Sequence, residues 1–204
     1  MSVRQTPPPD LLSPKQRLCL FHGTNVRAEE ALGLDESELT VQFLQEHGVS
    51  AKNLATAGVG PRLLQKFGMC ECRALRQLGF DALHLADSKF ASEANAVFGA
   101  ESVVETFLTG ASDAVALAGS DAVEILGLTP RQLLEACAGS PTEARAVMQQ
   151  LPLGVSLEGV PAATVLDTGM RKAVLSELGY SLTSIVKQTK ASPVELQKLG
   201  YGAI

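Results

Sequence analysis

The feature that most constrains this chain is a series of units about ten residues long, each opened by a glycine and carrying a leucine near its centre. The clearest units run from Gly48 to Gly79, as GVSAKNLATA, GVGPRLLQKF and GMCECRALRQL. Self-similarity at a fixed period is the signature of a repeat protein. Apolar residues keep this spacing over most of the chain, at Leu34, Leu44, Leu54, Leu64, Leu75, Leu85, Val104, Val115, Ile125, Leu134, Val155, Val165, Leu175, Ile185 and Leu196.

This period excludes one continuous helix. Each helical residue turns by roughly 100°, so a column of leucines spaced in this way would leave its face within a few units. The units are therefore predicted to be separate short helices, each ended by a glycine that takes positive φ. These glycines lie four residues after the apolar column, at Gly48, Gly58, Gly68, Gly79, Gly99, Gly119, Gly159, Gly169, Gly179 and Gly200. The predicted fold is all-α, a solenoid-like array of short helix-turn repeats of about ten residues.

Helix starts support the same interpretation independently. Four segments place Ser or Thr before a proline and a Gln or Glu three residues later, which is a capping box with proline at the first helical position. They begin at Ser13, Thr129, Ser140 and Ser192. Asp35, Ser50, Asp81 and Ser181 take the equivalent place in other units, and Asp35 is predicted to begin a longer helix reaching His47.

The domain organisation follows from where the repeat holds. Residues 1–12 contain a proline triplet and are predicted to form an extended arm. Residues 13–204 are predicted to be one elongated helical-repeat domain, because no linker-like segment interrupts them. The pattern weakens at 88–98, where Asn95 stands in the leucine column, and again at 152–161, which is rich in Gly and Pro. A kink or a longer connection is expected at both places.

Composition narrows the classes of partner and compartment. The net charge is −5, so the chain as a whole is not a polyanion binder, and aromatic residues make up only 4% of it. No run of apolar residues is long enough to cross a membrane, and the N-terminus resembles neither a secretory signal nor a transit peptide. Four cysteines in a chain of this length indicate reduced thiols. We expect an intracellular protein, cytoplasmic or organellar after removal of a targeting peptide, with no membrane insertion.

One turn gives an alternative function. The segment Leu54–Leu64, LATAGVGPRLL, resembles a helix-hairpin-helix, a nucleic-acid-binding motif with a Gly-hydrophobic-Gly turn. The resemblance implies that backbone N–H groups at Gly60 and Arg62 would hold a phosphate, with Lys52, Arg62 and Lys66 as counter-charges. Against this, Gly58 is already accounted for as one of the helix-ending glycines.

Two sets of metal-ligand residue types also occur. Cys19, His22, Cys70 and Cys72 make a permissible structural zinc set, although the two halves lie about fifty residues apart and cysteine is common in protein cores. Asp81, His84 and Asp87 recur at a helical spacing, which an ordinary solvated helix face explains equally well. No metal and no cofactor are assigned from these patterns.

No catalytic motif is present: neither a nucleophile–base arrangement, nor a phosphate loop followed by Lys-Ser/Thr, nor a His-Glu-x-x-His pair. The preferred hypothesis is a non-enzymatic protein-binding scaffold or accessory subunit of a larger assembly. The C-terminal end, with Leu199, Tyr201 and Ile204, is predicted to dock onto a protein partner or another copy. Nucleic-acid binding through Gly58, Gly60, Arg62 and Lys66 remains the alternative.

Overall fold

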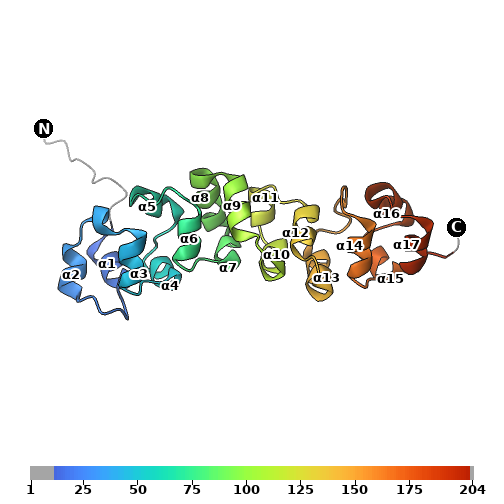
Figure 1. Cartoon of the computed structure of the whole chain (residues 1–204). Helices are drawn as coiled ribbons and strands as arrows, with labels where there is room; N and C mark the ends of the chain where they lie inside the picture. The colour runs from blue at the N-terminus through green and yellow to red at the C-terminus, as the bar shows by residue number, and fades with distance from the viewer. Residues whose placement is uncertain (1–11, 203–204) are drawn as a thin grey trace, which may run out of the picture. The chain divides into compact units, whose positions relative to one another are not determined.

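The protein is built from short helices. A computed structural model describes residues 12–202, and every regular element in this range is helical (Figure 1). The elements are α1 Pro14–Leu20, α2 Ala28–Gly33, the 3₁₀ helix η1 Glu36–Glu38, α3 Val41–Glu46, α4 Ala51–Thr56, α5 Pro61–Lys66, α6 Arg73–Gln77, α7 Ala82–Leu85, α8 Ser88–Phe98, α9 Ala100–Phe107, α10 Ala111–Ala118, α11 Ala122–Ile125, α12 Pro130–Ala136, α13 Pro141–Gln150, α14 Ala162–Asp167, α15 Lys172–Glu177, α16 Leu182–Thr189 and α17 Pro193–Lys198. The predicted all-α class is confirmed. The predicted N-terminal arm lies outside the described residues except for Leu12, which is buried.

Most glycines of the predicted column end a helix, as predicted, whereas Gly159 lies in the helix-free segment between α13 and α14. All but one of the glycines in the predicted column take positive φ, from +66° at Gly169 to +89° at Gly79 and Gly200. The exception is Gly119, which ends α10 with φ −99°. Positive φ is disfavoured for residues with a Cβ, so glycine sets the places where the chain turns.

The residue after the glycine forms a further buried column that the sequence pattern did not single out. In the Schellman motif, this residue donates its N–H to the carbonyl of the residue five positions earlier, and the two side chains pack together. Val49 N–H donates to Leu44 O at 2.8 Å, and both side chains are buried. The same bond and the same burial occur in the pairs Val59–Leu54, Met69–Leu64, Phe80–Leu75, Tyr180–Leu175 and Tyr201–Leu196. One turn thus ends the helix and also fixes two core side chains.

Helix α16 ends through a left-handed residue that is not glycine. Lys190 closes α16 in the left-handed region at φ 54°, the only such non-glycine residue in the described part of the chain. A Cβ in this region costs about 1 kcal/mol, part of which is regained from the lower entropy of the unfolded chain. We expect Lys190→Gly to raise the free energy of unfolding by about 0.5–1 kcal/mol.

Urea denaturation followed by circular dichroism measures this change. Lys187→Gly, within the same helix α16, is the matched control. There the substitution should lower the free energy of unfolding by about 1 kcal/mol, because glycine is a poor helix residue. Equal effects at the two positions would mean that the left-handed turn is not the cause.

Most of the predicted caps are present. The hydroxyl groups of Ser13, Thr129 and Ser192 accept from the third residue of α1, α12 and α17, and each of these residues closes a capping box. Ser50, Asp81 and Ser181 cap α4, α7 and α16. Two cap predictions are wrong. Ser140 precedes α13 without a side-chain cap, and Asp35 caps only η1, while the separate helix α3 is capped by Thr40.

The middle of the chain departs from the predicted register. The segment 88–98, where a kink or a longer connection was expected, is the eleven-residue helix α8, because no glycine interrupts it before Gly99. The residues buried here include Ala91, Ala94, Val103 and Ala114, whereas Val104, Val115 and Ile125 of the predicted column are half-buried. In a longer helix, the buried face lies at other positions relative to the glycine. The ten-residue period therefore no longer predicts which residues are buried. The segment 152–161 contains no helix, in keeping with the predicted connection.

Contacts divide the chain into two compact units. The first takes residues 12–80 and 93–102 of the described range, and the second takes 81–92 and 103–202. The single elongated domain predicted for 13–204 stays a prediction.

In the first unit, α1 packs against α2, the next helix, and against α4, the third α-helix after it. Side chains add cross-links between segments that are 31 and 32 residues apart. The Asn53 amide donates to His22 O at 2.9 Å, and the Gln45 amide donates to Gln77 O at 2.9 Å.

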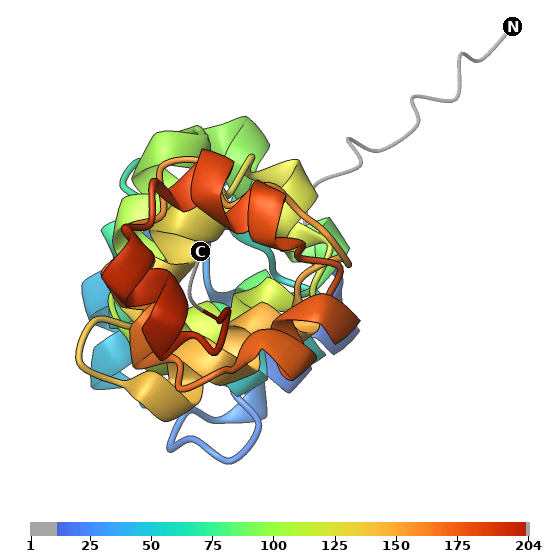
Figure 2. The same cartoon turned by 90° about the vertical axis from the view of Figure 1, so that its right-hand side faces the viewer.

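The second unit repeats this spacing. Helix α10 packs against α7 and α13, and α14 packs against α17. Figure 2 shows α14 to α17, drawn from orange to dark red, following one another around a ring that brings α17 back beside α14. Two backbone bonds join segments that are further apart in the sequence: Gly154 N–H donates to Leu178 O and Lys172 N–H donates to Leu199 O, both at 2.8 Å.

Candidate functional site

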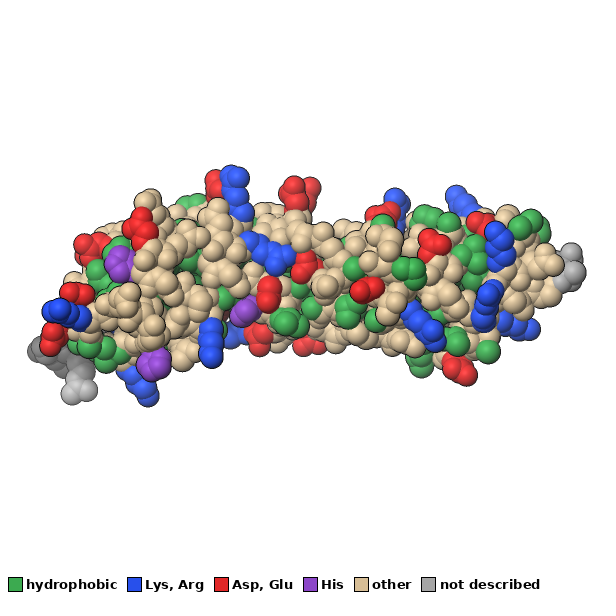
Figure 3. Space-filling view, turned by 60° about the horizontal axis from the view of Figure 1, so that its bottom comes forward, with side chains coloured by type: hydrophobic (Ala, Val, Ile, Leu, Met, Phe, Trp, Pro, Cys, Tyr) green, Lys and Arg blue, Asp and Glu red, His purple; other side chains and the backbone are tan. Residues whose placement is uncertain are grey.

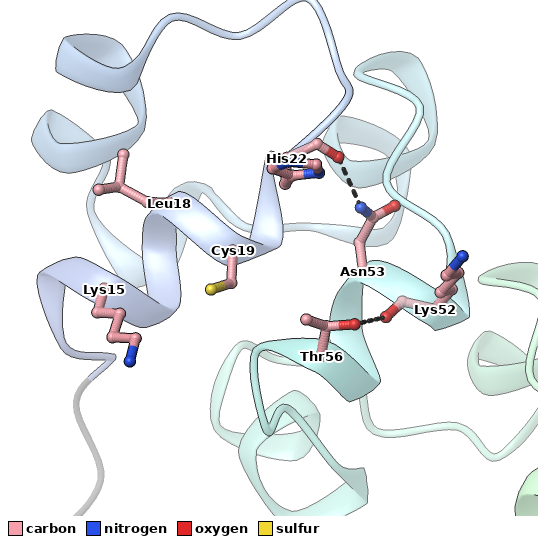
Figure 4. A pocket seen from close by; sticks show the side chains of 7 residues that line it. All are labelled: Lys15, Leu18, Cys19, His22, Lys52, Asn53 and Thr56. Carbon is pink, nitrogen blue, oxygen red and sulfur yellow. Dashed lines mark hydrogen bonds between the residues drawn. The ribbon is translucent and has the colours of Figure 1, made fainter.

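A pocket between α1 and α4, in the first unit, is the best candidate for a functional site. It has a volume of about 460 Å³, within the usual range for ligand sites. Figure 4 shows the side chains that line it: Lys15, Leu18, Cys19, His22, Lys52, Asn53 and Thr56.

Local sequence rules place these side chains. The capping box at Ser13 begins α1, so Lys15, Leu18 and Cys19 fall three and four residues apart on one helical face. The cap at Ser50 does the same for Lys52 and Thr56 on α4. The hydrogen bond between Asn53 and the carbonyl of His22 holds the two helices together at the pocket (Figure 4).

The pocket is electrostatically positive. None of its seven lining residues is acidic, while two are lysines and one is a histidine. Polar groups of α4 are already engaged: the Thr56 hydroxyl donates to Lys52 O at 2.7 Å, and Asn53 Oδ1 accepts from the backbone N–H of Ser50 at 3.0 Å. Among the described residues, no ion pair engages the ammonium groups of Lys15 or Lys52. These two ammonium groups are therefore available to a ligand, together with the ring of His22.

The two ammonium groups lie at opposite ends of the pocket in Figure 4, with Cys19, His22, Asn53 and Thr56 between them. Leu18 has 41% of its surface exposed and adds an apolar wall beside Lys15. The arrangement suits a ligand with separated negative charges and an apolar part.

Two other cavities, both in the second unit, have carboxylates in their lining and are not purely positive. A cavity of about 450 Å³ includes the carboxyl groups of Glu135 and Asp167 in its lining. A cavity of about 520 Å³ has both signs, with Asp167 and Glu195 beside Arg171 and Lys198. Charges there are partly satisfied within the chain, since the guanidinium of Arg171 donates to Lys198 O and the carboxylate of Glu195 accepts from Ser192.

The turn proposed for phosphate binding is a helix closure. Gly58 takes φ +72° and ends α4 in the Schellman motif described above, and α4 packs against α1. Gly60 is the N-cap of α5 in extended conformation, and a Cβ placed on it would lie 2.6 Å from Oε2 of Glu93. A carboxylate beside this turn repels a phosphate. Arg62 and Lys66 are exposed on α5.

The wider surface agrees with this result. On the face drawn in Figure 3, Lys and Arg side chains are interspersed with Asp and Glu, without a broad area of one sign. Nucleic-acid binders instead gather positive charge in a continuous patch. No observation on the described residues favours the nucleic-acid alternative.

The predicted C-terminal contact residues are mostly internal. Leu199 and Tyr201 are 1% and 5% exposed, so they do not form an apolar surface for a partner. Burial raises the pKa of the Tyr201 phenol, and its hydroxyl has no hydrogen-bond partner among the described residues. The Schellman turn at Gly200 folds both side chains inward, which the sequence pattern did not reveal. Ile204 lies outside the described residues.

The candidate metal ligands are not brought together. In the described range no group of three or more His, Cys, Asp or Glu side chains is placed to hold a metal ion. Cys19 and His22 border the pocket, whereas Cys70 is exposed and Cys72 is buried at the start of α6.

The Asp81–His84–Asp87 set serves helix starts. Asp81 Oδ1 accepts from His84 N–H at 3.1 Å and lies 2.7 Å from His84 Nδ1, and Asp87 Oδ1 accepts from Phe90 N–H at 2.9 Å. Partial burial alone would raise the pKa of Asp81, but the hydrogen bonds from His84 outweigh it and lower that pKa.

Comparisons of the chain with protein-family models, with curated proteins and with solved structures found no match. No helix in the described range is long and apolar enough to cross a membrane.

The sequence pattern missed the pocket as a site. Lys52 was singled out only as a counter-charge, and Cys19 and His22 only as metal ligands. To pair α1 with α4, the sequence would need a pattern that repeats every three units. The ten-residue period contains no such pattern.

Proposed function

We propose that this chain is a non-enzymatic helical-repeat protein that acts as a protein-binding scaffold or accessory subunit of a larger assembly. The observation that carries the proposal is the packing of a helix against the third helix further along in each unit, as in α1 with α4 and α10 with α13. This spacing, with a glycine turn after each short helix, supports a solenoid-like stacking of circuits about thirty residues long. Solenoids bind partners through the extended surfaces that stacked repeats create, mostly the concave ones.

Exposed apolar side chains offer positions at which to probe this surface. Leu32, Leu83, Leu153 and Val194 are each more than two-fifths exposed, on four different helices or loops. Single exposed apolar groups are ordinary on a protein surface, so these four serve as probe positions and not as an argument for a contact site. The chain is proposed to be intracellular, as its free cysteines suggest.

Affinity purification of the tagged chain from its native source, followed by cross-linking and mass spectrometry, tests the proposal. We expect one or a few proteins in near-stoichiometric amounts, with cross-links to the exposed lysines, and direct binding when the purified components are mixed. Leu83→Asp is a surface probe that leaves the buried core of α7 intact. Recovery of the chain as a monomer without any stoichiometric protein would contradict the scaffold function.

A further inference from the structure

The pocket between α1 and α4 has three features that define an occupant. Its two ammonium groups are unpaired among the described residues and lie at opposite ends, its lining has no carboxylate, and Leu18 exposes an apolar side chain at its margin. We propose that this pocket binds an acidic segment of a partner protein, in which two carboxylates reach Lys15 and Lys52 and an apolar residue contacts Leu18. This inference rests on the proposed function and adds the chemistry of the partner.

An extended acidic peptide fits these features better than a compact anion. The two ammonium groups lie on opposite sides of the pocket in Figure 4, an arrangement that suits two separate carboxylates, and strong phosphate sites add backbone N–H groups to the cations. Here the cap of each helix already engages one such N–H group: Gln16 N–H donates to Ser13 Oγ at 3.3 Å, and Asn53 N–H donates to Ser50 Oγ at 3.4 Å. The lysines therefore act as separate point charges, each suited to its own carboxylate.

The neighbouring surface supports charge complementarity. Lys15 and Lys52 are exposed on the first turns of their helices, where their flexible stems can follow a ligand. His22 lies between them and donates from both ring nitrogens when it is protonated. Exposed ion pairs are individually weak and screened by salt, so binding should be modest in affinity and should fall with ionic strength.

Fluorescence anisotropy on the full chain tests the proposal. The probes are labelled short peptides that carry two glutamates at varied separations with a leucine between them. The control peptides have glutamine in place of each glutamate. We expect saturable binding of the best acidic peptide, and binding about ten-fold weaker in Lys15→Gln/Lys52→Gln if each lost pair costs about three-fold. Leu18→Ala should weaken it by roughly three-fold, since a leucine contact is lost at a partly exposed site.

The matched control is Lys89→Gln/Lys187→Gln, which changes the net charge equally at two exposed lysines outside the pocket. All variants alter exposed side chains, and circular dichroism verifies their folding. An equal loss in the control pair, equal binding of the glutamine peptides, or competition by inorganic phosphate as strong as by the acidic peptide would overturn the proposal.

The native partner separates this inference from the proposed function. If a stoichiometric protein binds the wild-type chain and Lys15→Gln/Lys52→Gln equally well, the pocket is not its contact, and the scaffold function stands. If binding of that protein falls together with binding of the acidic peptide, both proposals are supported.

Discussion

Replacing Gly179 by alanine should lower the free energy of unfolding by about 3 kcal/mol, for two separate reasons. Gly179 ends α15 at φ +86°, where a residue with a Cβ is strained by 1–2 kcal/mol or so. The added Cβ would also lie 2.9 Å from the backbone N of Gly154. Since that nitrogen donates to Leu178 O at 2.8 Å, the methyl group would push apart the two segments joined by this bond, around Gly154 and Gly179.

Gly169→Ala separates the two reasons. Gly169 has φ +66°, but no atom lies within 4 Å of the position of its Cβ. This variant should lose about 1 kcal/mol, from the backbone conformation alone. Urea denaturation followed by far-ultraviolet circular dichroism measures both variants. If both lose the same free energy, the close approach of Gly154 and Gly179 does not contribute to stability.

Glycine turns could be predicted from sequence because their cause is local. A helix that ends in a Schellman motif needs positive φ at one residue, and only glycine takes that conformation without strain. The rule misses Lys190, which takes positive φ although it is not a glycine. It also wrongly predicts positive φ at Gly119. Gly119 has φ −99°, which any residue can adopt, and the atom nearest to a Cβ there is Oε1 of the flexible Gln150 side chain, at 3.0 Å.

Helix caps also differ in whether the sequence could predict them. Ser13 and Ser192 each have a partner three residues ahead, so residue types and spacing are enough to predict the bond. Ser140 has the same residues in the same order, yet its ψ of 78° turns the backbone away from cap geometry. Cys137 O accepts from the N–H of Ser140, a turn that the capping pattern does not include.

The core register could be predicted only where unit length is constant. Between α8 and α10 the helices have eight to eleven residues, and the buried positions move to Ala94, Val103 and Ala114. Alanine is ambiguous in a sequence, because it is frequent both in cores and on helix surfaces. Contacts with other helices decide which alanines are buried, and the period does not carry that information.

The candidate site lies furthest from what the sequence could predict. His22 and Asn53 are 31 residues apart, and their hydrogen bond depends on the packing of α1 against α4. A leucine period defines which face of each helix is buried but not which helix covers it. Lys15 and Lys52 therefore appear in the sequence as unrelated surface charges, and only the packing of α1 on α4 makes them two ends of one pocket.

Leu85→Ala is expected to lower the free energy of unfolding by about 3 kcal/mol, the central value for a leucine removed from a packed core. Leu85 is fully buried in the four-residue helix α7, which packs against α10. A helix of one turn has no stability of its own, so its place depends on the side chains that it buries. The loss should be larger than a transfer energy alone, because the backbone around α7 is held by caps and cannot collapse fully into the cavity.

Leu83, two residues earlier on the same helix, is 70% exposed and provides the matched control. Leu83→Ala should change the free energy of unfolding by less than about 0.5 kcal/mol, because no packed contact is lost. The two variants share residue type, helix and local propensity, and differ only in which face of α7 they occupy. If they prove equally destabilising in urea denaturation, the burial of Leu85 is not the cause of its loss, because alanine is the better helix former at both positions. In that case the leucine column would no longer explain what holds the short helices in place.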